Sequence, residues 1–460
     1  MYVFYSLIIS LLFLALLPYF IYNALRHGKY SGSFGQRMGR LPDSVKGSAG
    51  PTVWVHTVSV GEFNAARPLI SRLAREMPDH RLVISTTTLT GQRLARAAFD
   101  HVFFFPFDWG FVVRRALAHV RPEAVIILET ELWPNFLREC KRRGVSTIVV
   151  NGRISPRSFA RYMRVRPFIS RVLSDVTLLL MQSDEDAERV RALGADESRV
   201  KVCGNLKYDI EVPPRAEPGP RESRGASRLI VAGSTAAGEE GMILEALRQV
   251  RASAGFEDAR LIIAPRHPVR FDEVAALLSE TPFRYARRSE LAGADLAGAG
   301  GSGGIESLIG SLLSSPQGQT GLSSAPPGAP TDILLLDGIG ELAAVYRFAD
   351  VVFVGGSLVP RGGHNIIEPS AFARPVIVGP HTENFRGIVA DFRRADALVQ
   401  LEEAGAASLA REIIRLLSDR ETARSMGERA RNILLENQGA TARAVAGVRE
   451  TLNRAGGENS

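Results

Sequence analysis

The sequence Val351-Val-Phe-Val-Gly-Gly-Ser-Leu-Val-Pro-Arg-Gly-Gly-His364-Asn-Ile-Ile-Glu368-Pro begins with four apolar residues that predict a buried strand. The glycines after it let backbone N–H groups come close to a ligand, and residues 365–373 predict the first turns of a helix. N–H groups and the positive end of a helix together attract an anion. Glu368 follows His364 by about one helical turn, where a carboxylate can accept hydrogen bonds from ribose hydroxyls. The whole string predicts a nucleotide site, although its Gly-Gly pair alone would also suit an ordinary strand-to-helix connection.

Apolar runs alternate with segments of helical spacing along most of the chain. This alternation is typical of right-handed βαβ units, which build a parallel sheet covered by helices on both faces. We therefore expect an α/β protein with two doubly wound domains and with ligand sites at the carboxyl ends of their strands. The expected strands are 53–59, 82–86, 102–105, 124–128, 147–150 and 177–181 in the first half, and 229–233, 261–264, 333–336, 351–354 and 376–378 in the second.

The expected domain boundaries follow from changes in composition. Residues 26–208 form a first domain, and residues 209–227, with their prolines and charges, form a linker. A second domain covers residues 228–436, and residues 437–460 form a C-terminal helix and tail. Residues 291–330 are rich in Gly, Ala, Ser and Pro, and they predict a disordered surface insertion without chemistry.

The N-terminal residues 1–25 predict a membrane anchor. Residues 2–24 carry no charge, and about 20 such residues can span a bilayer. Arg26, Lys29, Arg37 and Arg40 follow, so the positive-inside rule places the rest of the chain in the cytoplasm. A cleaved signal peptide would need a basic start and a small-residue cleavage site, and neither is present. A full span and a helix that enters one leaflet both remain open.

Composition bounds the class of protein. A chain of 460 residues with 45% hydrophobic and 23% charged residues suits two or three globular units. The net charge of +7 fits an anionic partner, and without a nucleic-acid signature a membrane surface is favoured over nucleic acid. Cys140 and Cys203 form no disulfide framework or metal site, and each is expected to be a small core residue.

Charged residues follow several of the expected strands. Glu62 lies just past the first strand, where an acid is also favourable simply as a helix-terminus charge. Glu129 and Glu131 follow another strand, and Lys207 closes the first domain. Arg266 in the second domain offers a fork of donors to a phosphate or a base. Because carboxyl ends of parallel strands share one edge of a sheet, the side chains within each domain are candidates for a ligand site at that edge.

The chain resembles the 3-deoxy-D-manno-octulosonic acid (Kdo) transferases, membrane-anchored enzymes of lipopolysaccharide inner-core assembly. The matching strings occur in family order and reach from the anchor to about Gln438, and residues 291–330 depart from the family pattern. The strings are His56–Glu62, Glu129–Asn135, Asn151–Ser155, Gly204–Lys207, Pro265–Pro268, Phe353–Val359, Gly362–Asn365 and Gly379–Thr382.

The resemblance implies a GT-B architecture, in which two Rossmann-like domains face each other across a cleft. It also implies an inverting glycosyltransferase that moves Kdo from CMP-Kdo onto a lipid A precursor of the lipid IVA type and releases CMP. Glu62 would be the general base, and Glu129 and Lys207 would stabilise the transition state. No cofactor, metal or nucleic acid is implied, and the enzyme would lie on the cytoplasmic side of the inner membrane. The implied CMP-binding residues are Pro265, Arg266, Ile339, Gly340, Glu341, Asn365, Ile366, Ile367 and Glu368.

Three further readings stay open from the sequence. The arginines between Arg153 and Arg171 suit an acceptor with phosphates on its sugars, or an ordinary solvated helix face. A GT-B enzyme that uses a UDP-sugar, such as a lipid disaccharide synthase, is one rival, and the strings 265–268 and 362–365 argue against it. A non-catalytic membrane scaffold is the other rival, and the presence of every implied catalytic residue argues against it.

Overall fold

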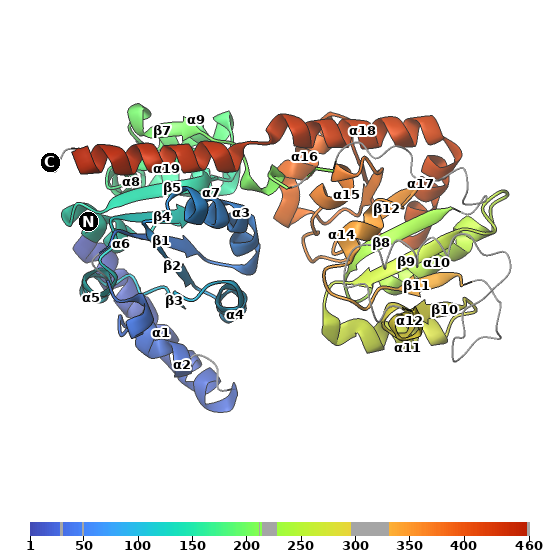
Figure 1. The fold of residues 1–460 in the computed structure, drawn as a ribbon, viewed down its shortest axis with the longest axis horizontal. Coiled ribbons are helices and arrows are strands. Elements are labelled where there is room, and N and C mark those ends of the chain that lie inside the picture. The colour runs from blue at the N-terminus through green and yellow to red at the C-terminus, as the bar shows by residue number, and fades with distance from the viewer. Residues whose placement is uncertain (28–30, 48–49, 211, 214–227, 296–330, 458–460) are drawn as a thin grey trace. The chain divides into compact units, whose positions relative to one another are not determined.

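The computed structural model describes residues 1–27, 31–47, 50–210, 212–213, 228–295 and 331–457. The chain forms two compact units (Figure 1). The first unit contains Met1–Asp209 together with Asn437–Ser460, and the second contains Ile210–Glu436. The C-terminal segment thus belongs to the first unit, although it follows the second in the sequence.

The first unit is built on a parallel sheet of seven strands in the order β3-β2-β1-β4-β5-β6-β7. Its central strands are apolar and buried along their whole length, as expected for strands covered on both faces. The strands are β1 (Thr52–Thr57), β2 (Arg81–Thr86), β3 (Val102–Phe104), β4 (Ala124–Leu128), β5 (Ser146–Gly152), β6 (Leu178–Met181) and β7 (Val200–Val202).

Helices cover both faces of this sheet. One core joins α5, α6, α8 and α9 to the sheet, and a second core joins α3 and α19 to its opposite face. Both cysteines are free and buried, which confirms their predicted place in the core. The helical elements are α1 (Tyr2–His27), α2 (Ser31–Arg37), η1 (Asp43–Val45), α3 (Val60–Glu76), α4 (Leu89–Ala98), α5 (Gly110–Val120), α6 (Pro134–Arg142), α7 (Pro156–Arg164), α8 (Arg166–Leu173), α9 (Asp184–Ala192), η2 (Glu197–Arg199), η3 (Leu206–Tyr208) and α19 (Ala440–Gly457).

The second unit repeats the design, with a seven-stranded parallel sheet in the order β10-β11-β9-β8-β12-β13-β14. Chain connections leave β8 toward one edge and β12 toward the other, so right-handed crossovers place their helices on opposite faces. The strands are β8 (Leu229–Thr235), β9 (Arg260–Pro265), β10 (Tyr285–Arg287), β11 (Ile333–Leu335), β12 (Val351–Val354), β13 (Val376–Val378) and β14 (Val399–Gln400).

The main core of the second unit lies between its sheet and the helices α10, α11, α17 and α18. The helices α14, α15 and α16 follow the strands that run toward the other edge of the sheet. The helical elements are α10 (Glu240–Arg251), η4 (Pro268–Arg270), α11 (Phe271–Ser279), α12 (Arg288–Asp295), α14 (Leu342–Tyr346), α15 (Ile367–Ala371), η5 (Glu383–Phe385), α16 (Arg386–Arg394), α17 (Ala406–Ser418) and α18 (Arg420–Asn437).

The predicted class, two α/β domains with parallel sheets, is confirmed, and every predicted strand is present. Three strands were missed, β7, β10 and β14, which lie at sheet edges and have two or three residues each. The predicted linker and insertion fall mostly on residues 211, 214–227 and 296–330, which lie outside the described residues. The start of the insertion, up to residue 295, belongs to α12.

The N-terminal helix α1 differs from the expected membrane anchor. Within the described residues, no helix combines the length and the apolar character needed to cross a bilayer, so a spanning anchor is not supported. One side of α1 instead makes polar contacts with the first unit. The Tyr5 hydroxyl donates to Asp108 Oδ2 at 3.0 Å, and Trp109 Nε1 donates to Ser10 Oγ at 3.0 Å. These polar groups reduce the apolar character of the helix and fix it to the domain.

Candidate functional site

Each sheet has a switch point where the strand order reverses direction. In the first unit it lies between the neighbours β1 and β4, and in the second between β8 and β12. Loops that leave such neighbouring strands in opposite directions open a crevice at the carboxyl ends of the strands. Glu62 follows β1 and Glu129 follows β4, so the two carboxylates flank the switch point of the first unit.

Glu62 is part of the N-terminal cap of α3. Ser59 precedes the helix, and its hydroxyl accepts the Glu62 N–H at 3.3 Å. The Glu62 carboxylate in turn accepts the Val58 N–H at 2.7 Å and the Ser59 hydroxyl at 3.1 Å. This reciprocal arrangement is a capping box, which fixes the side chain at the helix start. The role of Glu62 at the start of a helix, which the sequence had suggested, is therefore confirmed. This structural role is compatible with a chemical role for the same carboxylate.

The environment of Glu62 changes its acidity. Burial is the largest cause that raises its pKa, and the charges of Glu129 and Glu131 raise it further. Hydrogen bonds from Val58 and Ser59 act in the opposite direction, and the resulting pKa is about 7. A carboxylate with a pKa near the working pH can both accept and release a proton, which suits a general base.

Glu129 and Lys207 form an ion pair in the same unit, with 4.0 Å between Glu129 Oε1 and Lys207 Nζ. Glu129 has a φ of 56°, in the left-handed region that residues with a side chain rarely adopt. Such strain persists only where the surroundings impose it, and it is frequent at functional sites. The structure thus brings together the three residues that the sequence predicted as catalytic, because the charge of Glu129 also acts on Glu62.

Lys207 is positioned by asparagine side chains. It lies in the short turn η3, whose N-cap residue Asn205 accepts the Lys207 N–H through Oδ1 at 3.0 Å. Asn151, at the end of β5, accepts the Leu206 N–H at 3.0 Å and has a φ of 61°. The turn that carries Lys207 is therefore attached directly to the central sheet.

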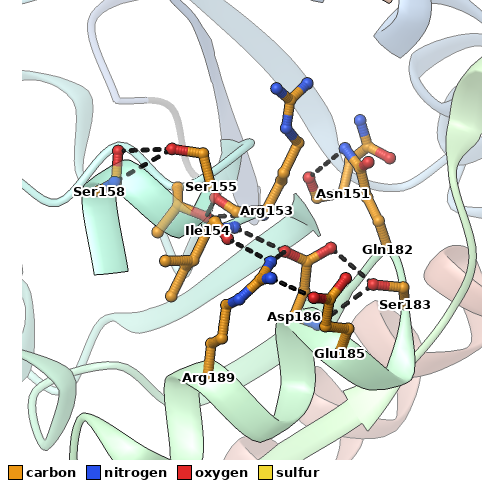
Figure 2. A network of polar contacts seen from close by, with 11 residues as sticks. Asn151, Arg153, Ile154, Ser155, Ser158, Gln182, Ser183, Glu185, Asp186 and Arg189 are labelled. Carbon is orange, nitrogen blue, oxygen red and sulfur yellow. Dashed lines mark hydrogen bonds and ion pairs between the residues drawn. The ribbon is translucent and has the colours of Figure 1, made fainter. Parts of the chain in front are cut away.

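The string Asn151–Ser155 covers the end of β5 and the loop that follows, and hydrogen bonds hold this loop on two sides (Figure 2). The Ile154 N–H donates to Asp186 Oδ1 at 2.8 Å, and Arg189 donates to the Ile154 carbonyl at 2.9 Å. On the other side, Thr130 exchanges two hydrogen bonds of 2.7 Å with the backbone of Arg153. The Arg153 guanidinium points away from the Asp186 cluster in Figure 2. Asp186 itself belongs to the first turn of α9, where the Ser183 hydroxyl accepts its N–H.

The second unit gathers a separate group of side chains after β9 and β12. The Arg266 N–H donates to the Thr235 carbonyl at 3.0 Å, which places Arg266 beside the switch point. Asn365 Oδ1 accepts the N–H of Ile367, the first residue of α15, at 3.1 Å, and its Nδ2 donates to Glu368 Oε1 at 3.1 Å. Burial raises the pKa of Glu368, whereas Asn365 and Arg266 lower it. Arg266, Asn365 and Glu368 therefore interact, as predicted for a nucleotide site.

His364 belongs to this group as well. Burial is the main reason that its pKa falls to about 4, and the charges of Arg266 and His267 contribute. At neutral pH the ring is uncharged and can donate one hydrogen bond to a ligand.

The turn Ile339–Glu341 does not share a hydrogen bond or ion pair with Arg266 or Glu368 among the described residues. Arg288 donates to Glu341 Oε1 at 3.1 Å, while Ile339 is 83% exposed. Gly340 has a φ of 88°, which suits glycine. The turn precedes α14, whose last residue is Tyr346. Burial raises the pKa of Tyr346 and the charge of Glu368 raises it further, whereas the charge of Arg266 lowers it.

The glycine corner after β12 corrects one expectation. The sequence predicted that its backbone N–H groups are available to a ligand anion. The N–H groups of Gly356, Ser357 and Leu358 instead donate to the buried carboxylate of Glu239, at 2.7, 2.9 and 2.8 Å. Glu239 follows β8, and sequence reasoning missed it. The signal available was the acidic pair Glu239-Glu240 just after an apolar strand at a switch point.

Glu131, which the sequence already grouped with Glu129 at a strand end, also contributes to the site. Burial and the charge of Glu129 raise its pKa, and its own charge acts on Glu62. The motif Glu129-Thr-Glu131 already placed it near the strand end, but only the fold shows that it adds to the negative charge around Glu62.

Comparison with known proteins identifies the class. Residues 329–433 match the family model of glycosyl transferases group 1. A glycosyltransferase from Rickettsia africae has the same fold, with a TM-score of 0.51 and 12% identity over 89% of this chain and 99% of that chain. The protein is a glycosyltransferase.

The first unit gives the family. Residues 32–210 match the family model of 3-deoxy-D-manno-octulosonic-acid transferase (kdotransferase). A 3-deoxy-D-manno-octulosonic acid transferase of Bordetella pertussis is 33% identical over 428 residues, which cover 90% of this chain and 91% of that protein. The corresponding enzyme of Haemophilus influenzae is 32% identical over 87% of both chains. The chain belongs to the Kdo transferase family.

Proposed function

We propose that this protein moves Kdo from CMP-Kdo onto a hydroxyl of a lipid A precursor, of the lipid IVA type, with inversion at the anomeric carbon. Family membership supports Kdo transfer in lipopolysaccharide biosynthesis. The observation that carries the mechanism is the pKa of Glu62, raised to about 7 beside the Glu129–Lys207 pair. A base with that acidity can take a proton from a sugar hydroxyl at neutral pH.

The proposed reaction is a single displacement. As the acceptor hydroxyl oxygen forms a bond to the anomeric carbon of Kdo, its proton passes to a Glu62 oxygen. The bond from that carbon to the phosphate oxygen of CMP breaks, and its electron pair leaves with CMP. Lys207 would offset negative charge on the phosphate or on the Kdo carboxylate, and Glu129 would favour positive character at the anomeric carbon.

The proposed CMP site is the group formed by Arg266, Asn365 and Glu368. Arg266 is exposed and carries a fixed positive charge suited to the single phosphate of CMP. Glu368 uses one oxygen for Asn365, which leaves the other for the ribose hydroxyls. Pro265, Ile366 and Ile367 would shape the walls of this site, and the Ile339–Glu341 turn would contact the base.

The proposed acceptor side is the loop and helix pair after β5. The helix α7 contains no buried residue, and its arginines are exposed. Phosphate groups on the acceptor sugars would interact with these charges as well as with Arg153, whose backbone is fixed by Thr130.

The direct test of the proposal is mass spectrometry of the product made by purified protein from CMP-Kdo and a lipid A precursor. A mass increase of one or more Kdo residues, with CMP released in equal amount, is the expected result. Parallel reactions with UDP-sugars provide the control. Transfer from a UDP-sugar and none from CMP-Kdo would replace the proposal with its main rival.

The pH profile is the first prediction. We expect kcat/KM to rise with pH through about 7, because Glu62 must lose its proton before it can act as a base. Glu131→Gln should move this limb to lower pH, because removing the Glu131 charge lowers the pKa of Glu62. A limb near 4.5, the ordinary value for a glutamate, would contradict the role given to the buried carboxylate.

Glu368→Ala is expected to weaken CMP binding by roughly 1–3 kcal/mol, the range for a buried hydrogen-bonding group left without its partner. Isothermal titration calorimetry measures this directly. The matched control is Glu421→Ala, an exposed glutamate in the first turn of α18. Equal CMP affinity in both variants would show that Glu368 only supports its helix.

We further propose that α1 associates the first unit with the cytoplasmic face of the inner membrane through one leaflet. The support is a set of exposed apolar side chains on α1. They do not contact the domain in the way that Tyr5 and Ser10 do. A surface of this kind gains free energy by entering the interfacial region of a bilayer. The exposed residues are Val3, Phe4, Leu7, Ile8, Leu11, Leu12, Leu14 and Leu16.

Leu7→Asp combined with Leu11→Asp should abolish most vesicle binding and leave the fold intact. Both side chains are more than half exposed, so the new carboxylates remain in water in the free protein. Membrane binding would move these charges into the bilayer, which costs free energy. Sedimentation with anionic vesicles at high salt is the measurement. Val269→Asp, at a position 89% exposed in the second unit, is the control. Undiminished, salt-resistant binding by the double variant would refute an interaction through α1.

A further inference from the structure

The buried carboxylate of Glu239 has an unusual set of partners. Its Oε2 accepts the N–H groups of Ala236 at 2.8 Å and of Gly356 at 2.7 Å. Its Oε1 accepts those of Ser357 at 2.9 Å and of Leu358 at 2.8 Å. The residue is fully buried, and four backbone donors suit an acceptor-only carboxylate. The four N–H groups form a nest, a concave group of backbone donors of the kind that binds phosphate in other proteins. In this protein the Glu239 carboxylate fills the nest.

This nest lies directly against the group that we assign to the donor. Gly356 has a φ of 69°, and its carbonyl accepts the Gly363 N–H at 2.7 Å. A Cβ at Gly356 would lie 2.7 Å from His364 Nε2, so His364 rests on the corner itself. A Cβ at Gly355 would lie 2.8 Å from Glu239 Oε2. The carboxylate, the glycine corner and His364 are therefore in close contact.

Two consequences follow for any anionic ligand. The N–H groups of residues 355–358 already donate within the protein, so a phosphate group placed against this segment would gain no hydrogen bond from them. It would also approach a buried negative charge, which is screened much less than a charge at the surface. Arg266 and the neutral His364 remain for a ligand, which is enough for one phosphate group.

We propose that Glu239 is a specificity-determining residue. Its carboxylate holds the glycine corner in place by accepting the N–H groups there, and its negative charge restricts the bound nucleotide to a single phosphate. The inference rests on the proposed function, because it takes the nucleotide to bind at Arg266, His364 and Glu368. It goes further by explaining, from residues of this chain, why a nucleoside monophosphate sugar is accepted and a nucleoside diphosphate sugar is rejected.

The test compares CMP with CDP by calorimetry in the full-length protein. The wild type should bind CMP at least about tenfold more tightly than CDP. Glu239→Ala empties the nest, so CMP binding should weaken while the CDP-to-CMP affinity ratio rises by about tenfold or more. Formate can refill the nest in this variant and should restore part of the CMP preference. Glu245→Ala, at a half-exposed position on the helix α10 that follows Glu239, is the control and should keep the wild-type ratio.

Glu239→Gln provides a second variant of equal size, in which an amide NH₂ replaces one accepting oxygen and faces backbone donors. It should weaken CMP binding, and formate should not restore it because the nest stays filled. Equal affinity of the wild type for CMP and CDP would overturn the inference, and so would an unchanged ratio in folded Glu239→Ala. If Glu239→Ala does not fold, the wild-type ratio and Glu239→Gln decide. A wild type that binds neither nucleotide would overturn the donor assignment itself and the inference with it.

Discussion

The Glu62→Gln enzyme is expected to keep its fold and its affinity for CMP while its turnover falls by about two to four orders of magnitude. In the wild type, Glu62 Oε2 accepts the Val58 N–H at 2.7 Å. Glutamine retains an oxygen that can accept this hydrogen bond, so the start of α3 stays capped. It cannot accept a proton from the acceptor hydroxyl. The substitution therefore separates the chemical role of Glu62 from its structural role.

Two comparisons make this prediction specific. Glu62→Ala should lose both roles, so its melting temperature should fall as well as its turnover. Glu76→Gln, at the exposed end of the same helix, removes an ion-paired carboxylate and should change turnover little. Turnover of Glu62→Gln within a few-fold of wild type would leave Glu62 with only its capping role.

The Lys207→Ala enzyme is expected to lose about two to three orders of magnitude in turnover, the usual cost of removing one group that stabilises transition-state charge. The loss leaves the Glu129 carboxylate, now 4.0 Å from Lys207 Nζ, without this partner. Single-turnover measurements at saturating CMP-Kdo should show the effect in the chemical step. Lys207→Arg keeps the charge and should recover part of the rate.

Lys201→Ala is the matched control for Lys207. Lys201 lies in β7 and forms an exposed ion pair of 2.8 Å with Glu450, which is screened by solvent. Its loss should leave turnover near the wild-type value. If Lys207→Ala behaves like Lys201→Ala, the pair with Glu129 is a surface ion pair without a part in the reaction.

The strands illustrate how far local sequence determines this fold. Runs such as Ala124–Leu128 and Val351–Val354 are apolar throughout, so they can be stable only between two layers of helices. The missed strand β7 has a buried residue followed by two exposed ones, and β14 has only two residues. These short edge strands form because a neighbouring strand is available for pairing. The local sequence contains no pattern that indicates this neighbour.

The N-terminal helix shows the opposite case. Residues 2–24 carry no charge. That composition is equally compatible with a helix that spans the membrane and with a helix that lies on its surface. In the fold, α1 is attached to the domain through Asp108, whose carboxylate accepts the Tyr5 hydroxyl and the N–H groups at the start of α6. Burial raises the pKa of Asp108 to about 7. Tyr5 and Asp108 are 103 residues apart in the chain, so the sequence alone cannot pair them.

The sequence by itself determined the two parallel α/β domains, the family, and the carboxylates and cations that follow the strands, because hydrophobic runs and short motifs act locally. The tertiary structure alone decided how those groups behave. The pKa of Glu62 depends on Glu129 and Glu131, which another strand brings near it. The N–H groups of the glycine corner are occupied by Glu239, which lies 119 residues before Leu358. Electrostatic coupling and hydrogen-bond occupancy depend on distance in space, and only folding sets that distance.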